Sequence, residues 1–183
     1  MTFREKSKVL DGEGIDKSLK RIAHEVLEKN QGSFESLAII GIMRRGATLA
    51  ERLKEEIRRI EGKELPLGTL DITFYRDDLT QIAQSPVVHE TQVGFDITDK
   101  KVILVDDVLF TGRTIRCALD ELIDFGRPRA VQLAVLIDRG HRDFPIRADY
   151  VGKNLPTSLQ EIVQVRLKEV DGADEVVIEE EEK

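Results

Sequence analysis

Hydrophobic residues recur at helical spacing in three parts of this chain. Side chains three or four positions apart lie on one face of a helix, and an apolar face of this kind packs against a protein core. The spacing predicts a helix near residues 15–29, a second that includes residues 50–60, and a third that follows residue 114. The positions that carry these predictions are, in order, Ile15, Leu19, Ile22, Ala23, Val26 and Leu27; Ala50, Leu53, Ile57 and Ile60; and Ile115, Ala118, Leu119, Leu122 and Ile123.

Strands are predicted between these helices. Residues 37–42, 102–105 and 131–137 are wholly or almost wholly apolar, which is typical of strands buried on both faces of a parallel sheet. Over residues 70–74 apolar and polar positions alternate, which predicts a further strand with one buried face. The alternation of strands and helices along the chain therefore indicates the α/β class with a parallel sheet.

The C-terminal part of the chain departs from this alternation. Two apolar runs, residues 162–167 and 175–178, flank Asp171-Gly172 and predict an antiparallel hairpin over about 162–178. The sequence contains no internal repeat and no linker, so we expect one domain that spans residues 1–183.

Composition limits the class of protein. The chain has 183 residues, of which 40% are hydrophobic and 34% charged, as in globular proteins with a sizeable core. It has no apolar run long enough for a membrane span, and residues 1–6 lack the apolar centre of a signal peptide. The single cysteine, Cys117, excludes an intramolecular disulfide and is expected to be a small packed side chain. These features predict a cytoplasmic protein without membrane contact.

The net charge is −7, which argues against a general nucleic-acid binder because such proteins carry a basic excess. Any contact with RNA would need a local basic patch on an acidic protein. The acidic residues 179–182 are most simply a solvated terminus.

Candidate chemistry is concentrated directly after the strand at residues 102–105. Asp106 and Asp107 follow it, and the turn Thr111-Gly112-Arg113-Thr114 opens the next predicted helix. Ligands bind at the carboxyl ends of strands in open α/β sheets, and a helix N-terminus offers unpaired N–H groups to an anion. Carboxylates that accept hydrogen bonds from hydroxyl groups, beside a cradle for phosphate, suit a sugar phosphate.

Two other interpretations of this run are less satisfactory. Receiver domains also carry an acid pair after an apolar strand, but there it ends the first strand and no such phosphate turn follows. A helix capped by Thr111 or Thr114 explains the threonines. It leaves unexplained two adjacent carboxylates, which repel each other unless a ligand or cation uses them.

The run resembles the PRPP-binding signature of the type I phosphoribosyltransferases. Further segments resemble one subfamily, the bifunctional pyrimidine operon attenuators and uracil phosphoribosyltransferases, and the resemblance extends from about Leu19 to Val177. It implies a central parallel sheet flanked by helices, a small hood and the C-terminal hairpin. The segments are Phe74-Tyr75-Arg76-Asp77-Asp78-Leu79, Ile137-Asp138-Arg139-Gly140-His141-Arg142, Pro145-Ile146-Arg147-Ala148-Asp149-Tyr150, Gly152-Lys153-Asn154 and Pro156-Thr157-Ser158.

The resemblance implies a transfer of ribose 5-phosphate from PRPP to uracil, which yields UMP and pyrophosphate. Asp106 and Asp107 match the acid pair that bonds the ribose hydroxyls, and their charge favours a cationic sugar in the transition state. The implied 5-phosphate ligands are the backbone N–H groups of the turn and its threonine hydroxyls. The substrate-binding signature comprises Asp106, Asp107, Val108, Leu109, Phe110, Thr111, Gly112, Arg113 and Thr114.

Pyrophosphate is implied to bind at two further segments. Arg44 and Arg45 occupy the pyrophosphate loop after the first buried strand, and Arg45 is grouped with the acid pair as catalytic. Arginine suits this position because its fork donates to two phosphate oxygens and stays charged. Residues 76–93 are polar and irregular, and they resemble the flexible loop that closes over pyrophosphate; Tyr75, Arg76 and Asp77 stand at its start. Mg²⁺ is expected to arrive on the pyrophosphate oxygens, without a site made by the protein alone.

Phe110 bears on the choice of base. Purine-specific relatives carry an additional Asp in the phosphate turn where this chain has Phe110, so the sequence favours a pyrimidine. The matching base-binding positions are Asp138, Arg139, Gly140 and Val163.

The attenuator activity implies binding to the leader mRNA of a pyrimidine operon, tuned by UMP or UTP. Lys17, Arg21 and His24 share one helix face with Lys20 at its edge, which on composition alone is an ordinary solvated face. A homodimer or higher homo-oligomer that joins two such faces could hold an RNA stem-loop. The further RNA-binding candidates are Arg142, Arg147 and Lys153. Two alternatives stay open at this point: a nucleotide sensor that binds RNA without catalysis, and a phosphoribosyltransferase for another base without RNA binding.

Overall fold

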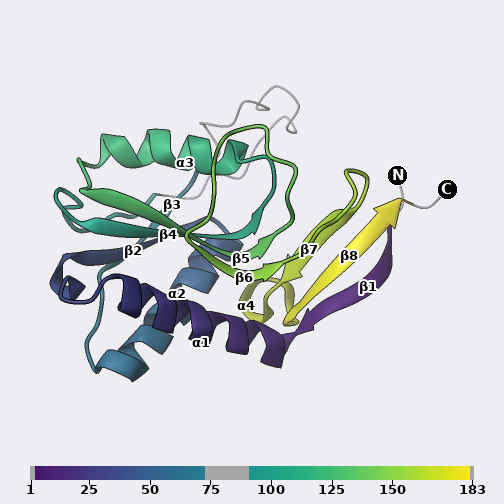
Figure 1. The fold of residues 1–183 in the computed structure, drawn as a ribbon, viewed down its shortest axis with the longest axis horizontal. Coiled ribbons are helices and arrows are strands. Elements are labelled where there is room, and N and C mark those ends of the chain that lie inside the picture. Colours follow the sequence, from purple (N-terminus) through teal and green to yellow (C-terminus); the bar gives the residue numbers. More distant parts are fainter. Residues whose placement is uncertain (1–2, 73–90, 182–183) are drawn as a thin grey trace.

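Two sheets organise the computed structural model, which describes residues 3–72 and 91–181 (Figure 1). The main sheet is parallel and has the order β3-β2-β4-β5-β6, and the second sheet is antiparallel with the order β1-β8-β7. The strands are β1 (Phe3–Asp11), β2 (Leu37–Ile42), β3 (Leu67–Leu70), β4 (Lys101–Leu109), β5 (Ala130–Asp138), β6 (Tyr150–Asn154), β7 (Ile162–Arg166) and β8 (Glu175–Glu181). The helices are α1 (Gly12–Lys29), α2 (Arg45–Glu61), α3 (Arg113–Asp124) and the short α4 (Lys168–Asp171), with a 3-10 turn at Phe34–Ser36.

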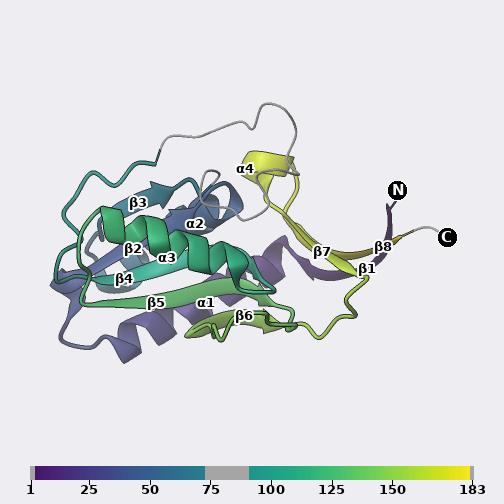
Figure 2. The ribbon, with the colours of Figure 1, turned by 90° about the horizontal axis from the view of Figure 1, so that it is seen from above.

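Helices cover both faces of the main sheet (Figure 2). Alternate residues of a strand point to opposite faces. Accordingly, Ile39 and Ile103 pack with α1 and α2, whereas Ile40 and Leu104 pack with α3. The nearly continuous apolar runs of β2, β4 and β5 therefore fill two separate hydrophobic layers, as the sequence predicts. Cys117 is buried in the layer beneath α3.

The antiparallel sheet β1-β8-β7, which we call the hood, projects beyond the carboxyl ends of the main strands and carries both chain termini (Figure 1). The predicted C-terminal hairpin is confirmed as β7 and β8, joined through α4 and Gly172. The hood also contains β1, which the apolar pattern does not predict. Its outer positions are charged, and Lys8 bonds Glu175 of β8 at 2.6 Å, so no apolar alternation marks it as a strand.

Several element boundaries differ from the predictions. Helix α1 begins earlier, at Gly12, because the Asp11 carboxylate accepts a hydrogen bond from Gly14 N at 2.8 Å and caps it. Strand β3 spans Leu67–Leu70, so it begins three residues before the predicted strand at 70–74, and positions 73–74 of that prediction lie outside the described residues. Strand β6 was not predicted; it is short and pairs in the main sheet only with β5.

Two side chains assigned to apolar helix faces lie at the surface. Ile123 is 67% exposed and Ile60 is 39% exposed, because each stands beside the buried stripe of its helix. No helix in residues 3–72 or 91–181 is long and apolar enough to cross a membrane.

Candidate active site

The strand order of the main sheet reverses between β2 and β4. After β2 the chain moves outward to β3, whereas after β4 it moves in the other direction to β5 and β6. Ligands of open α/β sheets bind where the strand order reverses in this way. The end of β2 leads into Arg44 and Arg45, and the end of β4 contains Asp106 and Asp107, so the fold brings these predicted site residues to the same end of the main sheet.

The acid pair lies within β4 and not after it, which corrects the predicted end of that strand. Pairing with β2 ends at Val105, but pairing with β5 continues to Leu109. Asp106 is 6% exposed, and its carboxylate accepts a hydrogen bond from Asp107 N at 2.9 Å. The Asp107 carboxylate accepts from Val108 N at 2.8 Å. The two acids are thus fixed where β4 has lost one neighbouring strand.

The electrostatic setting of the pair favours protonation. Burial raises the pKa of Asp106 well above its usual range, and the charge of Asp107 adds to this effect. Burial also raises the pKa of Asp107, while the Val108 N–H and the nearby charge of Arg45 oppose that rise. Two buried carboxylates held together in this way suit a partner that donates hydrogen bonds or brings positive charge.

The turn after β4 has the geometry of an anion cradle. Gly112 adopts φ +90°, a left-handed conformation that favours glycine, and α3 begins at the next residue. The carbonyl of Thr111 accepts hydrogen bonds from Asp143 N at 2.9 Å and Phe144 N at 3.0 Å. Arg113 N, the first N–H of α3, lies 3.4 Å from Thr111 Oγ1. The turn thus places the N-terminus of α3, with its first-turn N–H groups and positive dipole end, where an anion would bind.

The predicted pyrophosphate loop lies directly against the acid pair. A Cβ atom on Gly46 would come within 2.6 Å of Val105 O and 3.3 Å of an Asp106 carboxylate oxygen. Arg45 is held by two hydrogen bonds to Asp171 of α4, from Nε at 3.0 Å and from the terminal nitrogen at 2.7 Å. These bonds raise the pKa of Arg45 and the charge of Asp107 raises it further, so the guanidinium stays charged. Beside Arg44 opens a pocket of about 650 Å³, also lined by Thr48, Thr69 and Gln92.

The predicted base-binding loop packs against the phosphate turn. Arg139 is 6% exposed, and its guanidinium donates to Thr157 Oγ1 at 3.0 Å and Ser158 O at 2.8 Å. The same guanidinium lies over the ring of Phe110, and the ring of His141 meets Phe110 edge-on with centroids 6.1 Å apart. Burial lowers the pKa of Arg139. Arg139 therefore joins the base loop, the phosphate turn and the segment before β7.

Two other residues assigned to substrate lie differently. The Asp138 carboxylate accepts from Gly140 N at 3.0 Å and from Arg142 at 2.5 Å, which closes the base loop on itself. Val163 is 8% exposed and belongs to the hydrophobic layer of α1 and α2, so its side chain is largely a core residue. Tyr75, Arg76 and Asp77 lie outside the described residues.

Comparison with known proteins agrees with this geometry. Residues 6–169 match the model of the phosphoribosyl transferase domain family. A bifunctional protein PyrR of Pelotomaculum thermopropionicum is 60% identical over 175 residues, which are 96% of each chain. A bifunctional protein PyrR of Deinococcus radiodurans is 60% identical over 92% of each chain. The chain belongs to the PyrR family.

Solved structures agree with the fold expected for a PyrR family member. A hypoxanthine phosphoribosyltransferase of Trypanosoma cruzi superposes with a TM-score of 0.75 over 95% of each chain at 19% identity. One from Staphylococcus aureus gives a TM-score of 0.69 at 22% identity, over 94% of this chain and 92% of the other. The predicted type I phosphoribosyltransferase fold, with its hood and C-terminal hairpin, is confirmed.

The basic residues that the sequence assigned to RNA fall into two groups in this PyrR family member. Lys17, Lys20, Arg21 and His24 are exposed on α1, and Arg21 donates to the carbonyls of Val151 at 3.2 Å and Gly152 at 2.5 Å. That contact brings the exposed Lys153 of β6 beside α1. We call Lys17, Lys20, Arg21, His24 and Lys153 the α1–β6 face.

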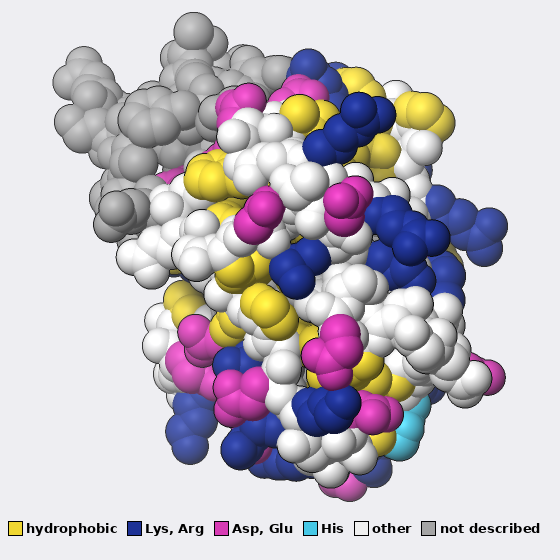
Figure 3. Space-filling view, turned by 90° about the vertical axis from the view of Figure 1, so that its left-hand side faces the viewer, with side chains coloured by type: hydrophobic (Ala, Val, Ile, Leu, Met, Phe, Trp, Pro, Cys, Tyr) yellow, Lys and Arg dark blue, Asp and Glu magenta, His cyan; other side chains and the backbone are white. Residues whose placement is uncertain are grey.

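The α1–β6 face also contains acidic partners. Lys17 pairs with Glu13 at 2.6 Å, and Arg21 pairs with Glu25 at 2.8 Å. At the end of the molecule away from the hood, Lys and Arg side chains are likewise interspersed with Asp, Glu and hydrophobic ones (Figure 3). Anion binding on α1 must therefore compete with ion pairs within the helix.

Arg142, a further RNA-binding candidate, is partly buried and forms a contact network of its own. Its guanidinium donates to Phe110 O at 2.7 Å, Gly140 O at 3.1 Å and Ile146 O at 3.0 Å, besides its bond to Asp138. An arginine so enclosed by carbonyl oxygens holds the loop in place. It fixes the peptide just before Arg147, which is exposed. The sequence motif marked Arg142 as special, but only the structure distinguishes this role from a surface contact.

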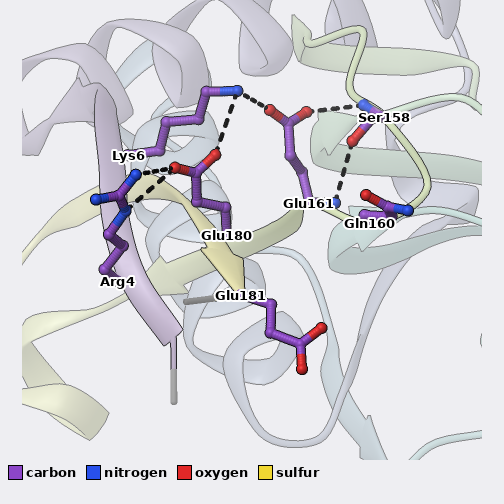
Figure 4. A pocket seen from close by; sticks show the side chains of 7 residues that line it. All are labelled: Arg4, Lys6, Ser158, Gln160, Glu161, Glu180 and Glu181. Atoms are coloured by element: carbon purple, nitrogen blue, oxygen red, sulfur yellow. Dashed lines mark hydrogen bonds and ion pairs between the residues drawn. The ribbon is translucent and has the colours of Figure 1, made fainter. Parts of the chain in front are cut away.

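A cavity of about 870 Å³ lies in the hood, outside the predicted site (Figure 4). Lys6 of β1 pairs with Glu161 and with Glu180, and Arg4 donates to Glu180 at 2.8 Å. Glu161 in turn accepts from Ser158 N at 2.7 Å. Through Ser158, whose carbonyl holds Arg139, the unpredicted strand β1 supports the base loop.

Proposed function

We propose that this chain transfers the phosphoribosyl group of PRPP to uracil. We further propose that it binds the leader RNA of a pyrimidine operon to control attenuation in response to uridine nucleotides. Membership of the PyrR family supports both activities. The observation that carries the transferase is the continuous unit of strand, acid pair, Gly112 turn and helix at the switch point of the sheet.

The acid pair would serve the ribose of PRPP. Asp106 and Asp107 would accept hydrogen bonds from its hydroxyls, and the first-turn N–H groups of α3 would bind the 5-phosphate. As the bond from the sugar carbon to pyrophosphate breaks, positive charge develops on the sugar, which the carboxylates stabilise. The new bond forms to a uracil ring nitrogen, which loses its proton.

Arg44 and Arg45 would receive the negative charge that develops on pyrophosphate. Arg45 is already preoriented by Asp171 and lies near the charge of Asp107, so it need not be ordered during the reaction. Tyr75, Arg76 and Asp77 are proposed to contact the same leaving group.

The substrate is proposed to be the Mg²⁺ complex of PRPP. No group of three His, Cys, Asp or Glu side chains in residues 3–72 and 91–181 could enclose a metal ion. Mg²⁺ retains most of its waters and prefers phosphate oxygens, so it would enter the site on the pyrophosphate oxygens of the substrate without a direct protein ligand.

Uracil is proposed to bind beside Phe110 and the loop Asp138-Arg139-Gly140. The buried Arg139 and the backbone groups of this loop provide hydrogen-bond donors and acceptors of the kind that a pyrimidine edge needs. Phe110 supplies an apolar surface at the position where purine-specific relatives carry an acid.

For RNA, we propose the α1–β6 face together with Arg147. Two copies of this surface in a homodimer or larger oligomer would supply enough positive charge to attract RNA despite the net charge of −7.

Incubation with PRPP, Mg²⁺ and uracil, followed by chromatography, tests the transferase. UMP formation is expected, whereas no product from uracil and ready product from a purine base would favour a transferase for another base. If no base reacts although RNA binds, the chain is a nucleotide sensor without catalysis.

Filter binding to the leader RNA of a pyrimidine operon tests the second activity. Specific binding that UMP tightens is expected, and a scrambled RNA of equal length is the control. Equal retention of both RNAs would reject attenuation by this chain.

A further inference from the structure

Helix α3 carries a carboxylate in its hydrophobic layer. Glu121 is 4% exposed, and one of its oxygens accepts a hydrogen bond from Thr91 Oγ1 at 2.5 Å. The other oxygen, Oε2, is buried and has no hydrogen-bond partner among the described residues. Burial raises the pKa of Glu121, and the nearby charges of Asp71 and Asp124 act in the same direction. A leucine at this position would avoid the free energy of burying a carboxylate, so stability does not explain why an acidic residue is present.

Thr91 connects Glu121 to the end of β3. Its hydroxyl accepts a hydrogen bond from Asp71 N at 2.9 Å, so its single hydrogen is available for Glu121. The next residue, Gln92, exchanges two backbone hydrogen bonds of 2.9 Å with Thr69 of β3. The Thr91 hydroxyl therefore joins Glu121 of α3 to Asp71 at the end of β3, and the backbone of Gln92 holds this segment beside β3.

The end of β3 in turn holds the start of the pyrophosphate loop. Leu70 lies opposite Ile42 in the parallel pairing, and its carbonyl accepts from Met43 N at 2.8 Å. Met43 directly precedes Arg44 and Arg45. A chain of contacts thus runs from α3 through Thr91, the Leu70–Asp71 segment and Met43 to the two arginines.

We propose that Glu121 is a positioning residue for PRPP: through Thr91 it fixes the end of β3 and thereby places Arg44 and Arg45 for pyrophosphate. The inference rests on the proposed transferase function. It requires an acceptor oxygen at residue 121 and a hydroxyl at residue 91, and nothing else from either side chain.

Four variants test this requirement. Glu121→Leu and Thr91→Val remove the contact, whereas Glu121→Gln keeps an acceptor oxygen and Thr91→Ser keeps the hydroxyl. We expect the first two to raise the KM for PRPP about tenfold, as small misplacements of binding groups do, with the KM for uracil unchanged. The other two should remain near wild type. Asp120→Leu, an exposed position on the same helix, is the matched control.

Thermal unfolding separates positioning from a structural role. Glu121→Leu removes a buried carboxylate, so its Tm should equal or exceed that of the wild type while PRPP binding weakens. An unchanged KM for PRPP in both disruptive variants would overturn the proposal. So would a parallel loss of Tm, PRPP use and uracil use, or a Gln variant as defective as the Leu variant.

Failure of the proposed function is recognised separately, because the wild type would then form no UMP. Calorimetric titration of the same variants with PRPP and Mg²⁺ still decides the inference in that case. Weaker binding in Glu121→Leu and Thr91→Val alone supports it, and equal binding in all variants overturns it.

Discussion

The guanidinium of Arg139 lies 4.1 Å from the centroid of the Phe110 ring. This cation–π contact joins the loop proposed to bind the base to the turn proposed to bind phosphate. Arg139 is also bonded to Thr157 and Ser158, so the Phe110 ring covers a guanidinium that is already held on its other sides. Arg139 carries the only positive charge in the segment Asp138-Arg139-Gly140.

Phe110→Leu should therefore weaken uracil use selectively. A cation–π contact contributes ~0.5–2 kcal/mol, which corresponds to a rise of roughly twofold to thirtyfold in the KM for uracil. The KM for PRPP should not change, because the turn offers backbone N–H groups to the phosphate. Steady-state kinetics with each substrate varied would measure this. Phe144→Leu, beneath Arg113 at 5.3 Å, is the control, and an equal effect there would contradict the assignment.

Asp107→Asn should lower turnover and leave RNA affinity intact. The amide keeps the shape but removes the charge, and loss of a charged hydrogen bond costs ~1.5–3 kcal/mol, or roughly a tenfold to hundredfold decrease in rate. UMP formation and filter binding measured on one preparation would test both halves. Asp120→Asn on the surface of α3 should change neither, and full activity in Asp107→Asn would refute the role of the acid pair.

Arg147→Ala should weaken RNA binding and reduce its dependence on salt. Removal of one cation that binds a phosphate lowers the slope of log affinity against log salt by about 1. Arg147 is exposed just before the edge strand β6, whereas Lys63, exposed before the opposite edge strand β3, provides a control of equal charge. Filter binding over a salt series should distinguish the two alanine variants. Identical slopes would remove Arg147 from the RNA surface.

Tyr150 should make the fold sensitive to alkali. Its hydroxyl donates to Gln132 Oε1 at 2.8 Å and accepts from Asn30 Nδ2 at 3.2 Å, and burial raises the pKa of Tyr150 to about 12. The pKa of this phenol is about 12 in the folded state and near 10 in the unfolded state, so the folded protein binds the proton more tightly. Its contribution is complete below pH 10 and is lost as the pH rises towards 12.

Tyr150→Phe isolates this contribution. At pH 8 the variant should be less stable by about 1 kcal/mol, the net value of a buried hydrogen bond. Between pH 10 and 12 the wild type should lose about 2 kcal/mol more than the variant, since each pKa unit corresponds to ~1.4 kcal/mol. Urea unfolding of both proteins at pH 10 and at pH 12 would measure this change in their relative stability. Parallel curves would show that Tyr150 does not titrate differently in the folded state.

Apolar periodicity predicted the parts of the fold that bury side chains densely. Residues 37–42 are predicted and observed as β2, because a strand covered on both faces must be apolar throughout. The pattern does not predict β1, because charged residues and one serine occupy positions 4–8 and its pairing partners in β8 lie more than 160 residues away.

The candidate site shows the same limit. The acid pair and the Gly112 turn were predictable because strand, acids and turn are contiguous. The contacts of Arg142 could not be predicted, because the carbonyls of Phe110, Gly140 and Ile146 that it binds come together only in the folded chain. The burial of Glu121 is visible in the sequence, because Glu121 follows Cys117 and Ala118 at helical spacing and so lies on the buried stripe of α3. Ile123 lies outside that stripe.

The close approach at Gly46 restricts how this site can change. Any side chain there would collide with the backbone at Val105, so the separation between the pyrophosphate loop and the acid pair cannot be adjusted by substitution at their contact. The part of the site proposed to bind the sugar phosphate therefore has a fixed width. On this proposal, a change of base preference would have to come from Phe110, the loop at Asp138 or the hood, where side chains can be exchanged one at a time.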